Sequence, residues 1–228
     1  GIDINHNNIY HHIDGACKRY NDYTQKYNKY TKCHFMVGDS GKDIKKNQAI
    51  NEQESIYLFQ SIKDIMNSKF DIISVQFAIH YFFEKDTILN TFIDNIDNYL
   101  KKGGYFIGTC LDGRTVFDSL KDKEYIEGVN EKGTLWKIQK KYDSKTFTNK
   151  FNQAINVYLY SINNTIEEYL VDFDFLTKKL KERNIELVND KSSNLFSEVY
   201  DEKYKLEDKE KELSFMYRYF IFKKINEI

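Results

Sequence analysis

A cluster of polar and aromatic side chains follows a strongly apolar stretch of the sequence. Segment 70–76 is almost continuously hydrophobic and ends in Gln76. Phe77, His80 and Tyr81 follow it closely. An aromatic ring can stack on a nucleic-acid base, and a histidine or glutamine beside it can hydrogen-bond the edge of that base. The same residues could instead begin a core helix that contains a satisfied histidine. The residue types alone do not separate these two interpretations.

A second candidate site lies in the pair Glu167-Glu168, which is followed by Tyr169. A carboxylate can accept hydrogen bonds from the N1 and N2 groups of guanine, and a charged acceptor makes these bonds stronger. Acidic residues are also favoured at an exposed helix N-terminus, where they interact with the helix dipole. From these residues alone, the helix N-terminus is the preferred interpretation.

Two aspartates, Asp3 and Asp39, follow short apolar segments. An acid at the end of a strand in an open α/β sheet commonly accepts hydrogen bonds from a ribose diol. Aspartate is equally common at helix caps and turns, so each residue alone is a weak indication of a ligand.

These side chains must be positioned by alternating strands and helices. Apolar patterns predict strands at 1–4, 34–37, 70–76 and 105–110, helices at 9–30, 52–67 and 84–100, and a helix stop at 101–104. This alternation is typical of a doubly wound α/β sheet, in which ligands bind at the carboxyl ends of the strands.

After residue 113 the pattern changes. Segments 135–142 and 154–160 alternate in polarity and are predicted to be antiparallel strands. A helix at 173–183, a strand at 185–190, a polar loop at 191–210 and an aromatic strand at 215–224 complete the prediction. We therefore predict one domain over 1–228, mostly parallel in its sheet, with an antiparallel C-terminal part and a small antiparallel insertion around 125–165.

Composition excludes several classes of protein. The 228 residues are 41% hydrophobic and 30% charged, which favours a folded domain over disorder. A net charge of −1 argues against a dedicated duplex-binding protein. The odd set Cys17, Cys33 and Cys110 indicates a reducing compartment, and no metal-ligand spacing or membrane-spanning run is present.

Five segments in order resemble the cap guanine-N7 methyltransferases, especially the capping enzymes of large DNA viruses. The family's QFAxHY segment is matched at 76–81, its GGxFIGT strand at 103–109 and its EYLV at 168–171. The closing strand 217–224 and the N-terminal GIDI with GACKRY at 15–20 also fit. The resemblance covers essentially the whole chain.

The resemblance implies a class I S-adenosylmethionine-dependent methyltransferase fold, with S-adenosylmethionine as the methyl donor and the capped 5′ end of RNA as the substrate. By position, it implies that the cofactor contacts Asp3, Asp39, Gln76 and Phe77. It implies that the cap guanine lies among His80, Tyr81, Glu168 and Tyr217, and that Arg19 reaches the cap phosphates. The family's first strand and glycine-rich loop would precede Gly1, so we expect the domain to be incomplete at its N-terminus.

Methyl transfer to guanine N7 needs no general base, because N7 carries an in-plane lone pair at neutral pH. We therefore expect in-line transfer with no residue acting as acid or base. The expected compartment is the cytoplasm, or a virion or viral factory. Other capping-enzyme domains or a stimulatory subunit are expected partners. No association with a membrane is expected.

Two other functions remain open from the sequence. A methyltransferase acting on a small metabolite explains the fold, but not the combination of His80-Tyr81 with Glu168-Tyr169. A non-catalytic, methyltransferase-like subunit of a capping complex explains the absence of the glycine-rich loop, but has no need of cap-binding residues. A general RNA-binding domain would be more basic.

Overall fold

The computed structural model describes residues 1–131, 133–147, 150–189 and 191–225. Contacts divide the chain into two compact units, which we describe separately. The first comprises 1–69 and 94–99, and the second comprises 70–93 and 100–228. The prediction of one domain over 1–228 stays a prediction.

The first unit is built around two short parallel strands, β1 (Ile2–Asp3) and β2 (Met36–Val37). Helices α1 (His6–Tyr10) and α2 (Ala16–Tyr27) connect them, and α3 (Gln53–Ser61) and α4 (Lys63–Asn67) follow. The loop after β2 is fixed by Asn95, whose side chain bonds the backbone of Ser40, Lys42 and Ile44. The loop that carries Asp39 is therefore anchored by buried hydrogen bonds.

The predicted helix over 9–30 is wrong at its start, because the chain forms two helices there. Helix α1 ends at Tyr10, and Gly15 is the N-cap of α2. Ile13, which seemed to belong to the apolar stripe, is 66% exposed and gains nothing from helical packing. The predicted helix over 52–67 is likewise divided at Ile62 into α3 and α4.

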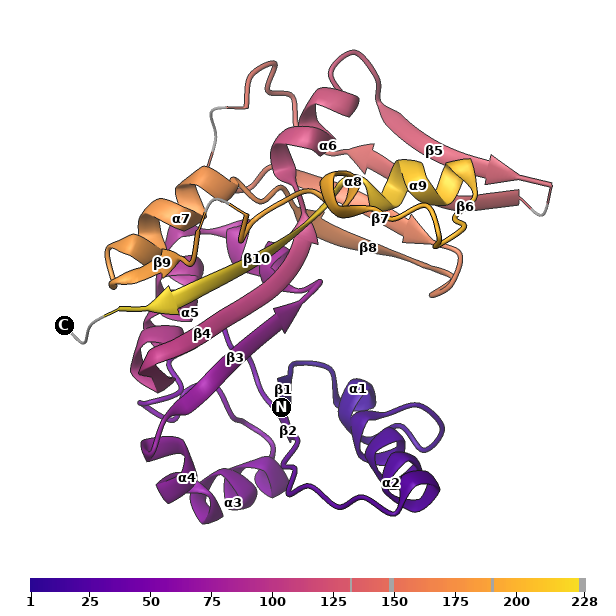
Figure 1. The fold of residues 1–228 in the computed structure, drawn as a ribbon. Helices are drawn as coiled ribbons and strands as arrows, with labels where there is room; N and C mark the ends of the chain where they lie inside the picture. Colours follow the sequence, from indigo (N-terminus) through magenta and orange to yellow (C-terminus); the bar gives the residue numbers. More distant parts are fainter. Residues whose placement is uncertain (132, 148–149, 190, 226–228) are drawn as a thin grey trace. The chain divides into compact units, whose positions relative to one another are not determined.

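The main sheet of the second unit has the order β3-β4-β10-β9 (Figure 1). Its strands are β3 (Phe70–Gln76), β4 (Leu100–Leu111), β10 (Tyr217–Lys224) and β9 (Ile185–Leu187). Strands β3 and β4 are parallel, whereas β10 is antiparallel to both β4 and β9. Helix α5 (Asp86–Tyr99) joins β3 to β4, and α7 (Phe173–Lys181) precedes β9. The predicted α/β class is confirmed.

A four-stranded antiparallel sheet lies in the same unit. It consists of β5 (Tyr125–Asn130), β6 (Gly133–Lys140), β7 (Ala154–Leu159) and β8 (Asn164–Tyr169). One face packs on α6 (Gly113–Ser119) through a buried apolar cluster. The cluster comprises Leu111, Val116, Phe117, Leu120, Trp136, Ile138, Phe147, Ile155, Val157 and Leu170.

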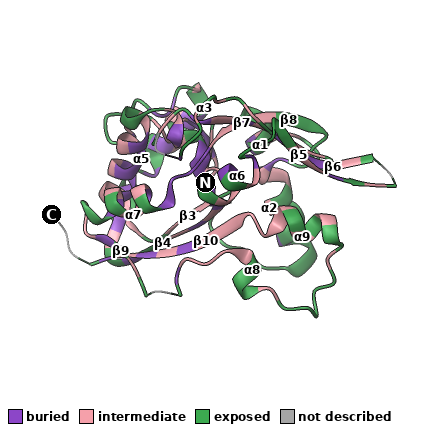
Figure 2. Cartoon of the chain, turned by 90° about the horizontal axis from the view of Figure 1, so that it is seen from above, coloured by how far each residue is buried: buried purple, intermediate pink, exposed green. Residues whose placement is uncertain are grey.

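Two further predictions are corrected in this unit. Residues 101–104 are part of β4, where the ladder has an irregularity between Phe70 and Ile72 and Gly103 takes a φ of +77°. Glycine adopts this backbone conformation without the steric cost that a side chain would add. The predicted loop at 191–210 contains α8 (Phe196–Val199) and the start of α9 (Asp208–Ser214), two helices without buried residues (Figure 2). Among the described residues, no helix is long and apolar enough to cross a bilayer.

Candidate functional site

The carboxyl end of β3 is tied to the neighbouring strand by a polar pair. Gln76 lies beside Thr109 of β4, and the Thr109 hydroxyl donates to Gln76 Oε1 over 2.9 Å. Gln76 Nε2 donates in turn to the Ser74 hydroxyl over 2.9 Å. The predicted cofactor residue Gln76 is therefore held in a fixed orientation at the strand end where α/β sheets bind ligands.

Phe77 has an unusual backbone conformation immediately after β3. Its φ is +52°, a left-handed value that costs a non-glycine residue about 1–2 kcal/mol. Its N–H donates to the Thr109 carbonyl over 3.0 Å, which maintains that conformation. The ring is 52% exposed and contacts Tyr217 edge-to-face, with ring centroids 5.2 Å apart. An apolar ring is thus held toward solvent at the strand end.

His80 lies in a short 3-10 helix, η1 (Ile79–Glu84), and is only 4% exposed. Burial lowers the pKa of its imidazole to about 3, so the ring is neutral at physiological pH. Its Nε2 atom is buried and has no hydrogen-bond partner among the described residues. Tyr81 packs against the ring, with centroids 4.1 Å apart, and is itself 42% exposed.

Glu168 lies opposite His80, near the end of β8. Adjacent strand residues face opposite sides of a sheet, so Glu167 and Glu168 have different environments. Glu167 pairs with Lys141 over 2.9 Å on an exposed face. Glu168 points toward the apolar cluster, and its Oε2 lies 3.4 Å from His80 Nδ1. Burial raises the pKa of the Glu168 carboxyl to about 7.

Tyr217 closes this group of residues from the first position of β10. Burial and the nearby Glu168 carboxylate raise the pKa of its phenol well above the usual value, so the hydroxyl remains a proton donor. The structure therefore brings together Phe77 with Tyr217 and His80 with Tyr81 and Glu168. The helix N-terminus that the acidic pair suggested is instead the end of a strand.

The buried Glu168 carboxyl reduces stability at neutral pH. Its pKa is about 7 in the folded chain and 4.5 in the unfolded reference, so the unfolded chain loses the proton first as pH rises. The linked cost grows above pH 4.5 and approaches about 3 kcal/mol. We expect Glu168→Gln to raise the free energy of unfolding by about 1–3 kcal/mol at pH 8 and much less at pH 5. Urea titrations at both pH values test this, and an equal gain at both would contradict it.

The remaining predicted residues belong to the first unit. Asp3 is the last residue of β1, and Asp39 follows the parallel strand β2 by two residues, so both lie at the carboxyl edge of that pair. Asp3 accepts from Asn5 N over 2.8 Å and from Asn8 Nδ2 over 3.1 Å. Asp39 Oδ1 accepts from Gly41 N over 2.9 Å. Arg19 is exposed on α2 and donates to the Asp14 carbonyl over 2.7 Å.

Comparison with known proteins identifies the family. The model of the mRNA (guanine-N(7))-methyltransferase domain matches residues 1–218. The chain belongs to this methyltransferase family. The resemblance that the sequence motifs suggested is therefore confirmed.

Two curated relatives are longer than this chain. A protein of Acanthamoeba polyphaga mimivirus named "Probable mRNA-capping enzyme" is 32% identical over 88% of the chain, which covers 18% of that protein. An mRNA cap guanine-N(7) methyltransferase of Meyerozyma guilliermondii is 26% identical over 73% of the chain and 34% of its own length. The chain thus spans about a third or less of the length of either relative.

A solved structure supports the fold. An S-adenosylmethionine-dependent methyltransferase from Clostridium acetobutylicum ATCC 824 superposes with a TM-score of 0.54 and 12% identity. The match covers 97% of this chain and 73% of the bacterial one. The predicted class I methyltransferase fold is confirmed, with sheets that are mixed rather than mostly parallel.

The sequence patterns did not indicate three polar residues beside the candidate site. Thr109 holds Gln76 and Phe77, as described above. Asp112, which is 3% exposed, accepts from Arg218 Nε over 2.8 Å, and this pair connects the ends of β4 and β10. Thr109 and Asp112 could have been predicted from the sequence, because both are polar residues at the carboxyl end of a strand. Arg218 had no comparable signal, because its partner lies 106 positions away.

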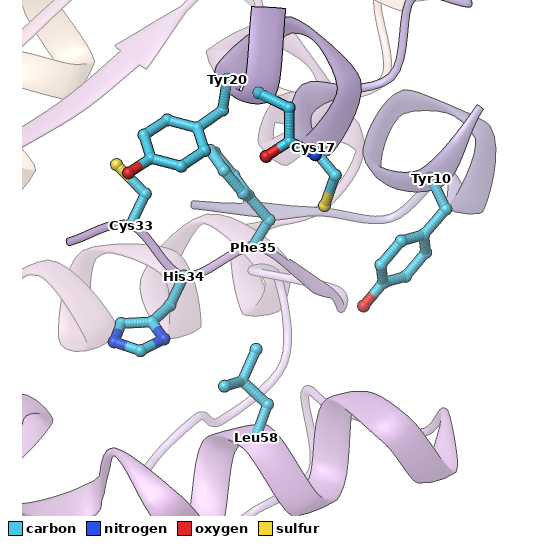
Figure 3. A pocket seen from close by; sticks show the side chains of 8 residues that line it. Tyr10, Cys17, Tyr20, Cys33, His34, Phe35 and Leu58 are labelled. Carbon is cyan, nitrogen blue, oxygen red and sulfur yellow. The ribbon is translucent and has the colours of Figure 1, made fainter. Parts of the chain in front are cut away.

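The first unit also contains a pocket that none of the predicted residues lines (Figure 3). Its volume is about 350 Å³, and α2, the segment before β2 and α3 contribute to it. Its walls are Tyr10, Cys17, Tyr20, Asn21, Cys33, His34, Phe35 and Leu58. The walls contain no carboxylate and no lysine or arginine, so they do not match the charged cap or the cofactor that the family motifs imply.

Proposed function

We propose that this chain transfers a methyl group from S-adenosylmethionine to N7 of the guanosine that caps mRNA. The observation that carries this proposal is Glu168, a largely buried carboxylate beside a neutral histidine and near exposed aromatic rings. A protein rarely buries a carboxylate without a charged partner unless a ligand supplies the missing hydrogen bonds. Membership of the family supports the same assignment.

The chemistry of guanine fits this set of side chains. The N1–H and N2–H₂ groups lie side by side on one edge of the base and can both donate to an ionised Glu168. Tyr81 supplies exposed ring surface on which a base can stack, at a gain of about 1–3 kcal/mol per base. A neutral His80 can orient the base without adding a positive charge beside a product that is itself cationic.

The residues available for S-adenosylmethionine fit the adenosine half of that molecule. Asp3 and Asp39 remain partly exposed at one strand edge, and a carboxylate can accept about four hydrogen bonds. Each therefore keeps acceptor capacity for a ribose or an adenine amino group. The family motifs assign Gln76 and Phe77, at the end of β3, to the same cofactor. When bound, S-adenosylmethionine supplies an electrophilic methyl group.

The side chains contribute orientation and not proton transfer. Guanine N7 attacks with its own lone pair, so the neutral His80 and the ionised Glu168 hold the base and keep their protonation states. Correct alignment of reacting groups can supply about 7–11 kcal/mol of the barrier reduction. Arg19 is an exposed cation that we assign to the cap phosphates, because a guanidinium can bind phosphate through two parallel bonds.

The wider context is part of the proposal. We propose the capped 5′ end of RNA as the substrate, and other capping-enzyme domains or a stimulatory subunit as partners. The mimivirus relative, of which this chain covers 18%, supports a multidomain setting. We also propose a cytoplasmic location, or a virion or viral factory.

The direct test is methylation of GpppN-capped RNA by the full-length protein, with label transfer from S-adenosylmethionine. We expect N7-methylguanosine as the product, identified by nuclease digestion and chromatography. Thermal shift with GTP and S-adenosylhomocysteine gives an independent binding readout. An enzyme for a small metabolite would ignore GTP, and a non-catalytic subunit would bind the cap without methylating it.

The pH dependence of this activity follows from Glu168. Only the ionised form accepts both bonds from guanine, and its pKa is about 7 in the free protein. We expect kcat/KM to rise with pH up to an apparent pKa near 7 and then to level off. The pKa of His80 is about 3, so it adds no second transition above pH 5. A flat profile between pH 5.5 and 8.5 would exclude Glu168 as the guanine acceptor.

A further inference from the structure

Gln153 is a buried side chain of the second unit whose amide group is unsatisfied. It directly precedes β7 and is 2% exposed. Both Nε2 and Oε1 are buried without a hydrogen-bond partner among the described residues. A buried polar group without a partner costs about 1–3 kcal/mol. The Gln153 amide would therefore gain stability from a hydrogen-bond partner.

The backbone of Gln153 lies between the two elements that carry His80 and Glu168. Leu170 N donates to the Gln153 carbonyl over 3.0 Å, which extends the β7–β8 ladder by one residue. The preceding residue, Asn152, donates from its N–H to the Phe83 carbonyl in η1, also over 3.0 Å. Residues three apart in a 3-10 helix lie on the same side, so His80 and Phe83 share a face.

The strand register places the Gln153 side chain on the same face of the sheet as Glu168. Ile155 is directly opposite Glu168, and Ala154 is opposite Tyr169. Side chains alternate along a strand, so Gln153 shares the face of Ile155 and is the diagonal neighbour of Glu168. Diagonal neighbours are about 7–8 Å apart, within reach of two long side chains.

Glu168 lacks the kind of donor that Gln153 can offer. Among the described residues, its polar contact is His80 Nδ1 at 3.4 Å, longer than an ordinary hydrogen bond to nitrogen. A carboxylate that is short of donors and an amide that is short of acceptors therefore share one buried face. An amide N–H that moves to the carboxylate gives the carboxylate a donor and gives Nε2 an acceptor.

We propose that Gln153 is a positioning residue for Glu168. When guanine binds, the Gln153 amide donates through Nε2 to the Glu168 carboxylate and fixes its orientation toward the base. This role rests on the proposed function, because it requires a bound guanine that draws Glu168 into its ionised form.

A double-mutant cycle in the full-length protein tests the proposal through kcat/KM for capped RNA. Methionine matches glutamine in length but cannot donate, so we expect Gln153→Met to lower kcat/KM about tenfold. In a Glu168→Ala background the same change should cost less than about twofold, because its target is gone. Gln139→Met, which removes an exposed amide from the other face of the sheet, should leave kcat/KM unchanged.

The stability of the free protein gives a readout that does not depend on activity. The amide is unsatisfied without ligand, so Gln153→Met should raise the melting temperature by about 2–4 °C. A fall in melting temperature would mean that the amide is already bonded, and would overturn the proposal. An equal loss of kcat/KM in both backgrounds would overturn it as well, since Gln153 would then act independently of Glu168. If the unaltered protein failed to methylate caps, the proposed function would fail first.

Discussion

Glu168→Ala is expected to lower kcat/KM for cap methylation by about 10²- to 10⁴-fold while the protein stays folded. The carboxylate accepts two hydrogen bonds from guanine, and a bond to a charged group contributes about 1.5–3 kcal/mol. Together they account for this range, because about 1.4 kcal/mol corresponds to tenfold. Steady-state kinetics with capped RNA, together with far-UV circular dichroism, separates the loss of activity from a loss of fold.

The neighbouring glutamate provides the matched control. Glu167→Ala removes the same chemical group one residue earlier, but from the exposed face where it pairs with Lys141. An exposed ion pair contributes about 0–1 kcal/mol, so we expect kcat/KM to stay within about twofold. Near-normal activity of Glu168→Ala, or equal losses in the two variants, would remove Glu168 from the guanine site.

Hydrophobic patterning was sufficient to predict the strands that carry this site. Strands β3 and β10 lie within a residue or two of their predicted bounds. The apolar run predicted β3 correctly although β3 has no buried residue and Ile72 is 57% exposed. The predictions failed where the pattern was weak or local. Exposed Ile13 imitated a helical stripe. The Lys-Lys-Gly-Gly run at 101–104 does follow the end of α5 at Tyr99, but it already belongs to β4, which begins at Leu100 and not at the predicted residue 105.

The environment of the site residues could not be derived from local sequence. Glu167 and Glu168 are equivalent in the sequence, and only the strand register assigns one to solvent and the other to the apolar cluster. The sequence did not indicate a role for Gln153, because that role depends on Glu168, its diagonal neighbour on the adjacent strand. The motif resemblance predicted that Glu168 binds guanine but gave no physical reason for it. The structure gives one, because the Glu168 carboxyl is largely buried beside His80 and would gain hydrogen bonds from a bound base.

The buried ion pair between Arg218 and Asp112 stabilises the second unit, so Arg218→Met is expected to lower its free energy of unfolding by about 3–5 kcal/mol. Asp112 is 3% exposed and would lose its counter-charge, and removing one partner of a buried pair typically costs this much. The change also removes two hydrogen bonds from the guanidinium to Ser193, over 2.9 and 3.0 Å. Urea unfolding monitored by circular dichroism measures the loss.

Two further variants separate the charge from the packing. Lys223→Met changes another cation on the same strand, and we expect a cost below about 1 kcal/mol because its contact with Tyr105 is partly exposed. Adding Asp112→Asn to Arg218→Met removes the orphaned charge and should recover part of the loss, since an asparagine side chain is neutral. If the double variant were no more stable than Arg218→Met, the loss would come from packing alone. Because Arg218 directly follows Tyr217, the pair that secures the start of β10 also fixes the residue that closes the candidate guanine site.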